Sequence, residues 1–274
     1  MEKDLKEKNK SAHKLKGLPP IYYLNLDEHS ERRKYMEDQF EYWEIKNYTR
    51  IPAYDGRDGR DLGDILKGRY PDGMSSGEVG CTTSHLKAMK HFLENSDAPC
   101  LMMMEDDCDI STVLYWPFVW KDFYSKIPYD YDVIQLAVIN LQSIHMQLHR
   151  RFVNDFSTAC YLITRRHCQK LIDLHVRGDK YKIDNGVKPR AVADDLIYNS
   201  GNTFAIPLFL YKIELGSSIH DDHIDTFHKG SYDGLWNFWK QQAVDQEWDK
   251  LFEYDPYFNR LPPKEHIKEE ESSE

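Results

Sequence analysis

The amino-acid sequence predicts an α/β protein with three layers, in which helices cover both faces of a mixed, mostly parallel sheet. Three observations favour this class. Short apolar runs rich in β-branched and aromatic residues alternate with segments of helical periodicity. Some of these runs are apolar throughout, which is typical of strands buried on both faces. The chain has 274 residues, enough to bury the core of one such domain.

The first half of the chain supplies three predicted strands and two predicted helices. The strands are expected at residues 21–26, 48–53 and 100–104. The first helix should follow Ser30 as its N-cap, and its apolar face consists of Met36, Phe40 and Trp43. The second helix is expected over residues 82–94. The run at 100–104 ends abruptly in acidic residues, so we expect it to be a central strand.

The second half continues the same alternation. Strands are expected at residues 133–138, 159–163 and 203–211, with a helix over residues 166–174. Pro207 interrupts the last strand and predicts an edge strand or a strand start there. Four aromatic residues are spaced for a helix that packs on the core, although they could also stack on sugar rings: Tyr232, Trp236, Phe238 and Trp239. A flexible charged leader (1–18) and acidic tail (262–274) should flank a single domain over 19–261.

Composition excludes several functions. The formal net charge of −10 argues against a nucleic-acid partner, which requires a basic face. No apolar run approaches the length of a membrane helix, and the N-terminus lacks the apolar core of a secretory signal. The five cysteines are odd in number and contain no C-x-x-C pair, so neither a zinc site nor a disulfide framework is indicated. We therefore expect reduced thiols and a cytoplasmic protein, while the oligomeric state is not predicted.

An acidic turn follows the central strand. Glu105, Asp106, Asp107 and Asp109 place four carboxylates within five residues, at the end of a strand where ligands bind in open α/β sheets. Such a cluster needs either a cation or full solvation. Mn²⁺ or Mg²⁺ would suit these oxygen ligands and could bridge them to a diphosphate. Asp107 belongs to both acid-x-acid pairs, so it is the first choice as metal ligand, with Glu105 and Asp109. The alternative is a solvated acidic turn.

Motifs in the first 110 residues resemble glycosyltransferase family 25. They are Asn25-Leu26-Asp27 with Arg32-Arg33, Ile51-Pro52-Ala53 with Asp55-Gly56, Gly77-Glu78-x-Gly80-Cys81-x-x-Ser84-His85, and Glu105-Asp106-Asp107. A weaker match continues through residues 158–171 and Asp194-Asp195. The resemblance implies a GT-A type fold, a UDP-sugar donor, a divalent metal, and inverting transfer of galactose or glucose to a hydroxyl of a glycan or of hydroxylysine in a collagen-like protein.

The same resemblance assigns donor-binding roles. Ser84 and His85 are expected in the first turn of the second helix, facing the donor; the alternative is a capping serine and a packed histidine. Glu78 would bond a ribose or sugar hydroxyl. Arg32 would reach a phosphate or the uracil, or would be solvated on an exposed helix turn. The remaining donor-binding candidates come from the matched motifs: Asn25, Asp27, Glu105 and Asp106.

The catalytic base and a third metal ligand are expected later in the chain. An inverting transferase needs a carboxylate to take the proton of the acceptor hydroxyl, and Asp195, followed by Asp194, is the candidate. The alternative role for either residue is to cap a helix that begins near Leu196. His220 or His223 could complete the metal site, or each could be a surface histidine.

Two other functions remain open. The chain could be an inactive homologue that binds a sugar or a nucleotide. A nucleotidyltransferase ranks lower, because the loop after the first strand, residues 25–29, contains no glycine for a phosphate-binding turn.

Overall fold

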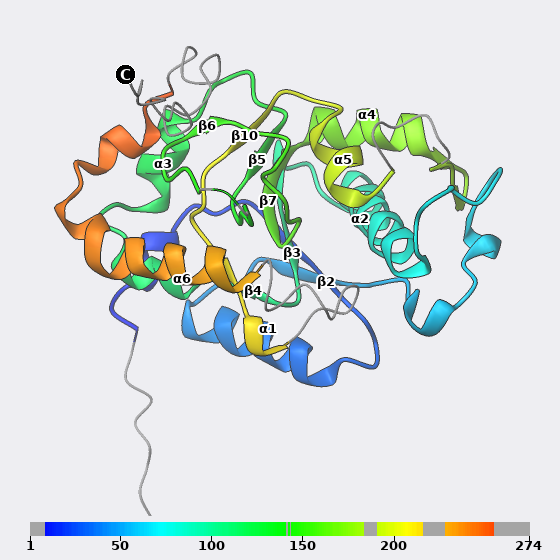
Figure 1. Ribbon diagram of the computed structural model, residues 1–274, viewed down its shortest axis with the longest axis horizontal. Coiled ribbons are helices and arrows are strands. Elements are labelled where there is room, and N and C mark those ends of the chain that lie inside the picture. Colours follow the sequence, from blue (N-terminus) through cyan, green and yellow to red (C-terminus); the bar gives the residue numbers. More distant parts are fainter. Residues whose placement is uncertain (1–8, 141, 143, 184–190, 216–227, 255–274) are drawn as a thin grey trace, which may run out of the picture.

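The computed structural model describes residues 9–140, 142, 144–183, 191–215 and 228–254. A seven-stranded sheet forms its centre (Figure 1). The strands lie in the order β2 (Tyr48–Pro52), β1 (Ile21–Asn25), β3 (Cys100–Glu105), β7 (Cys160–Thr164), β5 (Val133–Gln135), β10 (Thr203–Ala205) and β6 (His149–Arg150). Only β7 and β6 run antiparallel to the others. The predicted α/β class with a mixed, mostly parallel sheet is confirmed.

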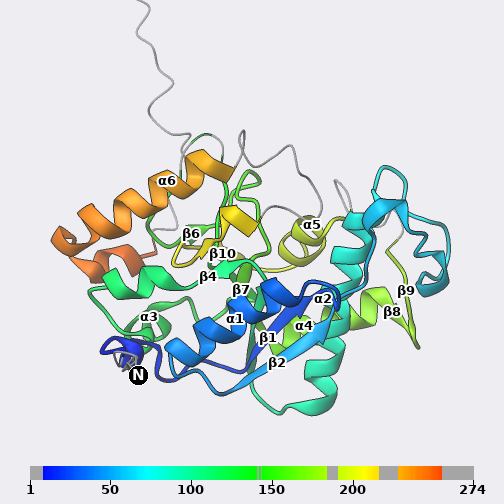
Figure 2. The same cartoon turned by 90° about the horizontal axis from the view of Figure 1, so that it is seen from below.

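Helices cover both faces of this sheet (Figures 1 and 2). One face carries α1 (Ser30–Tyr42), α3 (Trp120–Lys126) and α6 (Lys229–Asn237), and the other carries α2 (Ser76–Asn95), α4 (Arg165–His175) and α5 (Ala193–Tyr198). Strand β1 shows why both faces are apolar: Tyr23 packs with Phe40 of α1, whereas Tyr22 and Leu24 belong to the core under α2. A strand buried on both faces is expected to be apolar on both, as residues 100–104 of β3 are.

Smaller elements complete the fold. Strand β4 (Cys108–Asp109) pairs with β11 (Leu210–Tyr211), and β8 (Val176–Arg177) pairs with β9 (Lys180–Tyr181). The short helical turns are η1 (Ala12–Leu15), η2 (Arg57–Gly59), η3 (Gly63–Ile65), η4 (Ser111–Tyr115), η5 (Ile213–Leu215), η7 (Phe238–Gln242), η8 (Ala243–Asp245) and η9 (Trp248–Phe252). Within the expected leader, η1 packs on the domain: Leu15 is buried, and Lys14 donates to three backbone carbonyls near η4.

The second helix begins six residues earlier than predicted. Helix α2 begins at Ser76, and Ser75 caps it in a reciprocal capping box with Glu78. The glycines of this segment indicated a loop, but Gly80 lies inside the helix. A glycine is needed there because the helix passes close to another segment of backbone. A Cβ atom on Gly80 would lie 2.7 Å from the carbonyl oxygen of Tyr54. Ser84 and His85 therefore lie in the third turn of α2, and the predicted placement in its first turn is wrong.

Other boundaries also differ from the prediction. The N-cap position of α1 is His29, and Ser30 is the first helical residue. Strand β5 ends at Gln135, because the next backbone N–H groups turn to the carbonyl of Cys160. Pro207 lies between β10 and β11, which belong to different sheets, so it marks a break and not an edge strand.

The aromatic residues near α6 divide between two environments. Phe238 and Trp239 are buried in the core, as predicted. Tyr232 and Trp236 are half-buried, and the Trp236 ring meets Tyr115 edge to face.

Candidate active site

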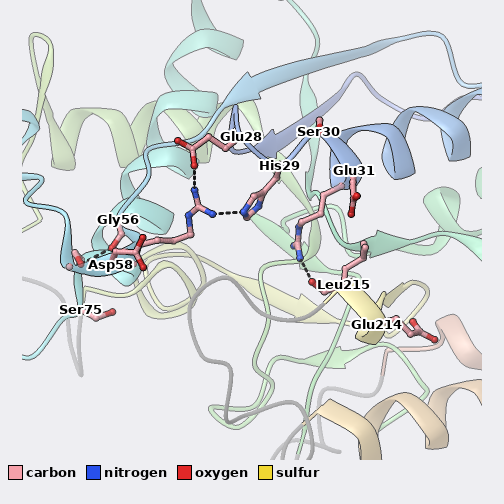
Figure 3. Close-up of a pocket in the computed structure, with 14 residues that line it drawn as sticks. Glu28, His29, Ser30, Glu31, Gly56, Asp58, Ser75, Glu214 and Leu215 are labelled. Atoms are coloured by element: carbon pink, nitrogen blue, oxygen red, sulfur yellow. Dashed lines mark hydrogen bonds and ion pairs between the residues drawn. The ribbon is translucent and has the colours of Figure 1, made fainter.

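A hollow lies at the carboxyl ends of β1, β2 and β3, where α1 and α2 begin (Figure 3). It comprises an open cavity of about 820 Å³ and a smaller one of about 110 Å³ beside it. Both are lined by His29, Arg32, Gly56, Arg57 and Gly77. The smaller cavity also reaches the acidic turn, where Glu105, Asp106 and Asp107 line it. The larger volume lies in the range of small-molecule sites.

Arg32 and Asp106 form the base of this hollow. The Arg32 guanidinium contacts the Asp106 carboxylate through Nε at 2.7 Å and Nη2 at 2.6 Å. Asn25 donates to the other Asp106 oxygen at 2.7 Å. All three residues are buried, and Arg32 also donates to the carbonyl of Leu215. Arg32 is therefore neither solvated nor on an exposed turn, and it ties α1 to the acidic turn and to η5.

Asp107 is the least satisfied carboxylate at the site. Its Oδ2 lies 3.0 Å from Nη2 of Arg32, but its Oδ1 is buried and has no hydrogen-bond partner among the described residues. Burial raises the pKa of Asp107 to about 7; the charges of Glu105 and Asp106 add to this shift, and Arg32 opposes it. A bare, buried oxygen of this kind suits a hard divalent cation.

Glu105 is held by a chain of polar side chains. His85 lies with Nε2 at 3.2 Å from Glu105 Oε1, and Thr158 donates to the same oxygen at 2.5 Å. The other ring nitrogen of His85 is 2.9 Å from the Tyr161 hydroxyl. Burial acts to raise the pKa of Glu105, but the hydrogen bonds from His85 and Thr158 hold it below its ordinary value. Glu105 is therefore an ionised carboxylate at the end of β3.

A second network forms the rim of the larger cavity. Arg57 donates to Glu28 at 2.7 Å and to Nε2 of His29 at 2.6 Å (Figure 3). Asp55 accepts from both Arg57 and Arg60. These contacts link the loop after β1 to the loop after β2.

Polar residues at the end of β1 are also fixed. Asn25 Oδ1 accepts from Arg50 at 2.9 Å and from Arg33 at 3.3 Å. Asp27 is exposed, and its carboxylate pairs with Arg50 at 2.5 Å. The buried Asn25 side chain therefore holds the side chains of Arg33 and Arg50 in place, while Asp27 remains accessible at the surface.

Asp194 and Asp195 differ in their surroundings. Both lie in the first turn of α5, after Val192 at the N-cap position, so neither residue caps the helix. Asp195 accepts from the side chain of Asn199 at 3.1 Å. Asp194 accepts from the backbone N–H of Ser157, and its buried Oδ1 has no partner among the described residues. Burial raises the pKa of Asp194 to about 6, with a further contribution from the charge of Glu105.

The other predicted site residues have different surroundings. Ser84 accepts from the backbone N–H of Tyr54 and donates to the carbonyl of Gly80, so it joins α2 to the loop after β2. Glu78 is part of the capping box of α2. Asp109 accepts from the backbone N–H of Ser111, at the turn into η4. His220 and His223 lie outside the described residues.

Sequence reasoning missed several residues of the site. Arg57 and His29 line both cavities, and Tyr161 and Thr158 fix the His85–Glu105 pair. Arg57 follows a turn signal and could have been noticed there. The role of Tyr161 depends on the pairing of β7 with β3, which no local pattern reveals.

Two expectations based on composition can be compared with the structure. All five cysteines are free. No helix in the described part of the chain is both long enough and apolar enough to cross a membrane.

Solved structures resemble this chain only distantly. The crystal structure of A197 from STIV has a TM-score of 0.35 and 10% sequence identity, covering 70% of this chain and 83% of that chain. HddC from Yersinia pseudotuberculosis complexed with GMP-PN has a TM-score of 0.32 and 12% sequence identity, covering 70% of this chain and 92% of that chain. A further HddC structure from Yersinia pseudotuberculosis has a TM-score of 0.32 and 14% sequence identity, covering 77% of this chain and 78% of that chain. No curated protein sequence is significantly similar to this chain.

The family comparison is more informative. The model of glycosyltransferase family 25, described as LPS biosynthesis protein, matches residues 18–185, which is more than half of the chain. The match includes β1, β2, β3 and α2, the elements that surround the hollow. The chain therefore belongs to glycosyltransferase family 25.

Proposed function

We propose that this protein is an inverting, metal-dependent glycosyltransferase that moves a hexose, galactose or glucose, from a UDP-sugar to a hydroxyl of a glycan. The observation that carries the proposal is the bare, buried Oδ1 of Asp107, a residue that lines the smaller cavity beside the larger one of about 820 Å³. Family membership supports the transferase activity, and the family description as an LPS biosynthesis protein favours a glycan over hydroxylysine.

The residues at the acidic turn fit a hard divalent ion such as Mn²⁺ or Mg²⁺. Asp107 is the proposed first ligand, because its Oδ1 has no other partner among the described residues. Glu105 is the second candidate ligand. It ranks after Asp107 because its Oε1 already accepts hydrogen bonds from His85 and Thr158. Asp109 drops out of the proposed set, because its carboxylate caps the turn at Ser111. A bound ion would stabilise the departing diphosphate.

Donor binding is proposed to use the rest of the hollow. Arg32 and Asn25 hold the Asp106 carboxylate, so the acidic turn is already ordered before donor binds. Arg57 and His29 lie on the cavity wall and offer polar contacts to the nucleotide. Asp27 at the exposed end of β1 and Glu78 at the start of α2 remain candidates for ribose or sugar hydroxyls.

We assign the general base to Asp194 in preference to Asp195. Two observations support this choice: Asp194 has a bare buried oxygen, and its pKa of about 6 suits a base that works near neutral pH. Asp195 is engaged with Asn199. In the proposed reaction, Asp194 takes the proton of the acceptor hydroxyl as that oxygen attacks the anomeric carbon from the face opposite the diphosphate.

A screen of UDP-sugars, with and without an acceptor, tests this proposal. UDP release should require Mn²⁺ or Mg²⁺, should favour UDP-galactose or UDP-glucose, and should rise when oligosaccharide acceptors are added. Asp194→Asn should suppress the acceptor-dependent release while UDP affinity is retained, and Asp195→Asn is its matched control. If no UDP-sugar is consumed although UDP binds, the chain is an inactive nucleotide-binding homologue. If hydroxylysine peptides alone stimulate release, the glycan assignment is wrong.

A further inference from the structure

Three potential metal ligands of mixed chemistry meet beside the proposed donor site. Cys81 and His85 are four residues apart on α2, so both side chains point from the same face of the helix. Glu105 reaches them from the end of β3. One ligand atom from each of the three residues lies within 4.8 Å of the others. The sequence did not reveal this group, because the third ligand comes from a different element and no C-x-x-C pair is present.

We propose that Cys81, His85 and Glu105 bind a thiophilic divalent cation of the Zn²⁺ class. One sulfur, one nitrogen and one oxygen ligand are the donor set that Zn²⁺ accepts in sites with three protein ligands, whereas Mg²⁺ and Mn²⁺ prefer oxygen alone. This site is therefore distinct in its chemistry from the oxygen site proposed at Asp107.

The histidine is already prepared for such a role. His85 and Tyr161 are both fully buried, and the Tyr161 hydroxyl lies 2.9 Å from Nδ1. A hydroxyl can donate to a bare nitrogen or accept from an N–H, so Tyr161 serves either tautomer of His85. When Nδ1 carries the proton and donates to Tyr161, Nε2 gives up the proton that it otherwise donates to Glu105 and can bind an ion in its place. Metal-binding histidines are commonly oriented in this way by a partner on the other ring nitrogen.

An ion would have access and an open coordination position. Cys81 and Glu105 both line the smaller cavity, so two of the three ligands can be reached from it, while His85 is fully buried. A fourth position would be filled from the cavity, by water or by a ligand. Cys81 would bind as the thiolate, and its proton would pass to solvent. Thr158 would continue to hold Glu105 through its hydrogen bond at 2.5 Å.

The consequence is competition with the donor complex. Glu105 is a proposed ligand both of this site and of the oxygen site at Asp107, and the two sites adjoin the same cavity. Occupancy by a thiophilic ion therefore weakens the binding of UDP with Mn²⁺, and the site acts as an inhibitory one.

Cobalt spectroscopy on the full chain tests the proposal without any donor. The reduced, metal-free protein should bind one Co²⁺ with a thiolate-to-cobalt charge-transfer band in the near ultraviolet, and Zn²⁺ should remove this band. Cys81→Ser should abolish the band and weaken Zn²⁺ binding by more than the 10- to 100-fold typical of losing an outer partner. Tyr161→Phe should weaken Zn²⁺ binding by about 10-fold. Cys168→Ser, which removes another buried thiol, is the matched control and should keep the band.

The outcomes separate this site from the proposed function. Asp107→Asn should keep the band while losing metal-dependent UDP binding. The proposal is overturned if the wild-type protein shows no thiolate band, or if the band survives in Cys81→Ser. Should Cys81→Ser fail to fold, alkylation of the native protein followed by mass spectrometry decides: Zn²⁺ must protect Cys81 and Mg²⁺ must not, and equal labelling would refute the site.

Discussion

Replacing Arg32 by methionine tests how the acidic turn is held. Arg32 is 8% exposed and contacts Asp106 twice and Asp107 once, all at 3.0 Å or less. Methionine keeps most of the apolar stem but removes the charge, which leaves two carboxylates buried without their cation. Removing one partner of a buried ion pair costs about 3–5 kcal/mol. For a chain of this size each kcal/mol lowers the melting temperature by about 2–4 °C, so we expect a loss of roughly 6–20 °C.

Lys34→Met provides the matched control on the same helix. The Lys34 and Asp38 side chains are 73% and 59% exposed, so their ion pair is worth at most about 1 kcal/mol. Thermal unfolding of both variants, followed by circular dichroism at one pH and ionic strength, gives the comparison. If Arg32→Met melts within about 4 °C of Lys34→Met, the buried network does not hold the acidic turn in the way described.

Three further predictions concern catalysis and packing. If Asp194 is the base, kcat should rise with pH through about 6, where its carboxylate ionises, and Asp194→Asn should lose 10²- to 10⁴-fold in kcat; a flat pH profile would contradict this. Asp155→Ala, which removes the hydrogen-bond partner of a buried histidine, should cost about 1–3 kcal/mol in denaturant unfolding at neutral pH. Hydrogen bonds hold the pKa of Asp155 below its ordinary value against burial, so its stabilisation is present at neutral pH and lost as pH falls below about 4, where the two proteins should converge. Gly80→Ala should cost about 1–3 kcal/mol in the same assay, since its Cβ would lie 2.7 Å from the Tyr54 carbonyl oxygen, while Gly230→Ala, with open space around it, should be neutral.

The inner strands of the sheet, such as β3 and β7, were predictable from the sequence because they are apolar on both faces. The run at 100–104 could only be a buried strand, and the acids after it had to lie at the sheet edge, where Glu105, Asp106 and Asp107 do line the cavity. The start of α2 was not predictable in the same way. Gly80 indicates a loop locally, and only the close crossing over Tyr54 and Gly56 explains why a helix there needs this glycine.

The roles of individual side chains were less predictable than the site's location. The sequence left open whether Arg32 binds the donor or is solvated, because its contacts with Asp106 and Leu215 lie 74 and 183 residues away in sequence. The difference between Asp194 and Asp195 was also hidden, since Asp194 contacts Ser157 in another part of the chain, whereas Asp195 contacts Asn199 at the end of the same helix. Local patterns identify residues able to do the chemistry, whereas their protonation depends on long-range contacts.

Calorimetric titration of UDP into wild-type protein and Asp107→Asn, with Mn²⁺ and in excess EDTA, tests the central claim most directly. The bare Oδ1 of Asp107 is the feature on which the metal and donor assignment depends. Wild-type protein should bind UDP about 10-fold or more tightly with Mn²⁺ than with EDTA, a difference of about 1.4 kcal/mol. Asp107→Asn should lose that difference, and the matched control Asp109→Asn should keep it. A metal dependence that persists undiminished in Asp107→Asn would contradict the account.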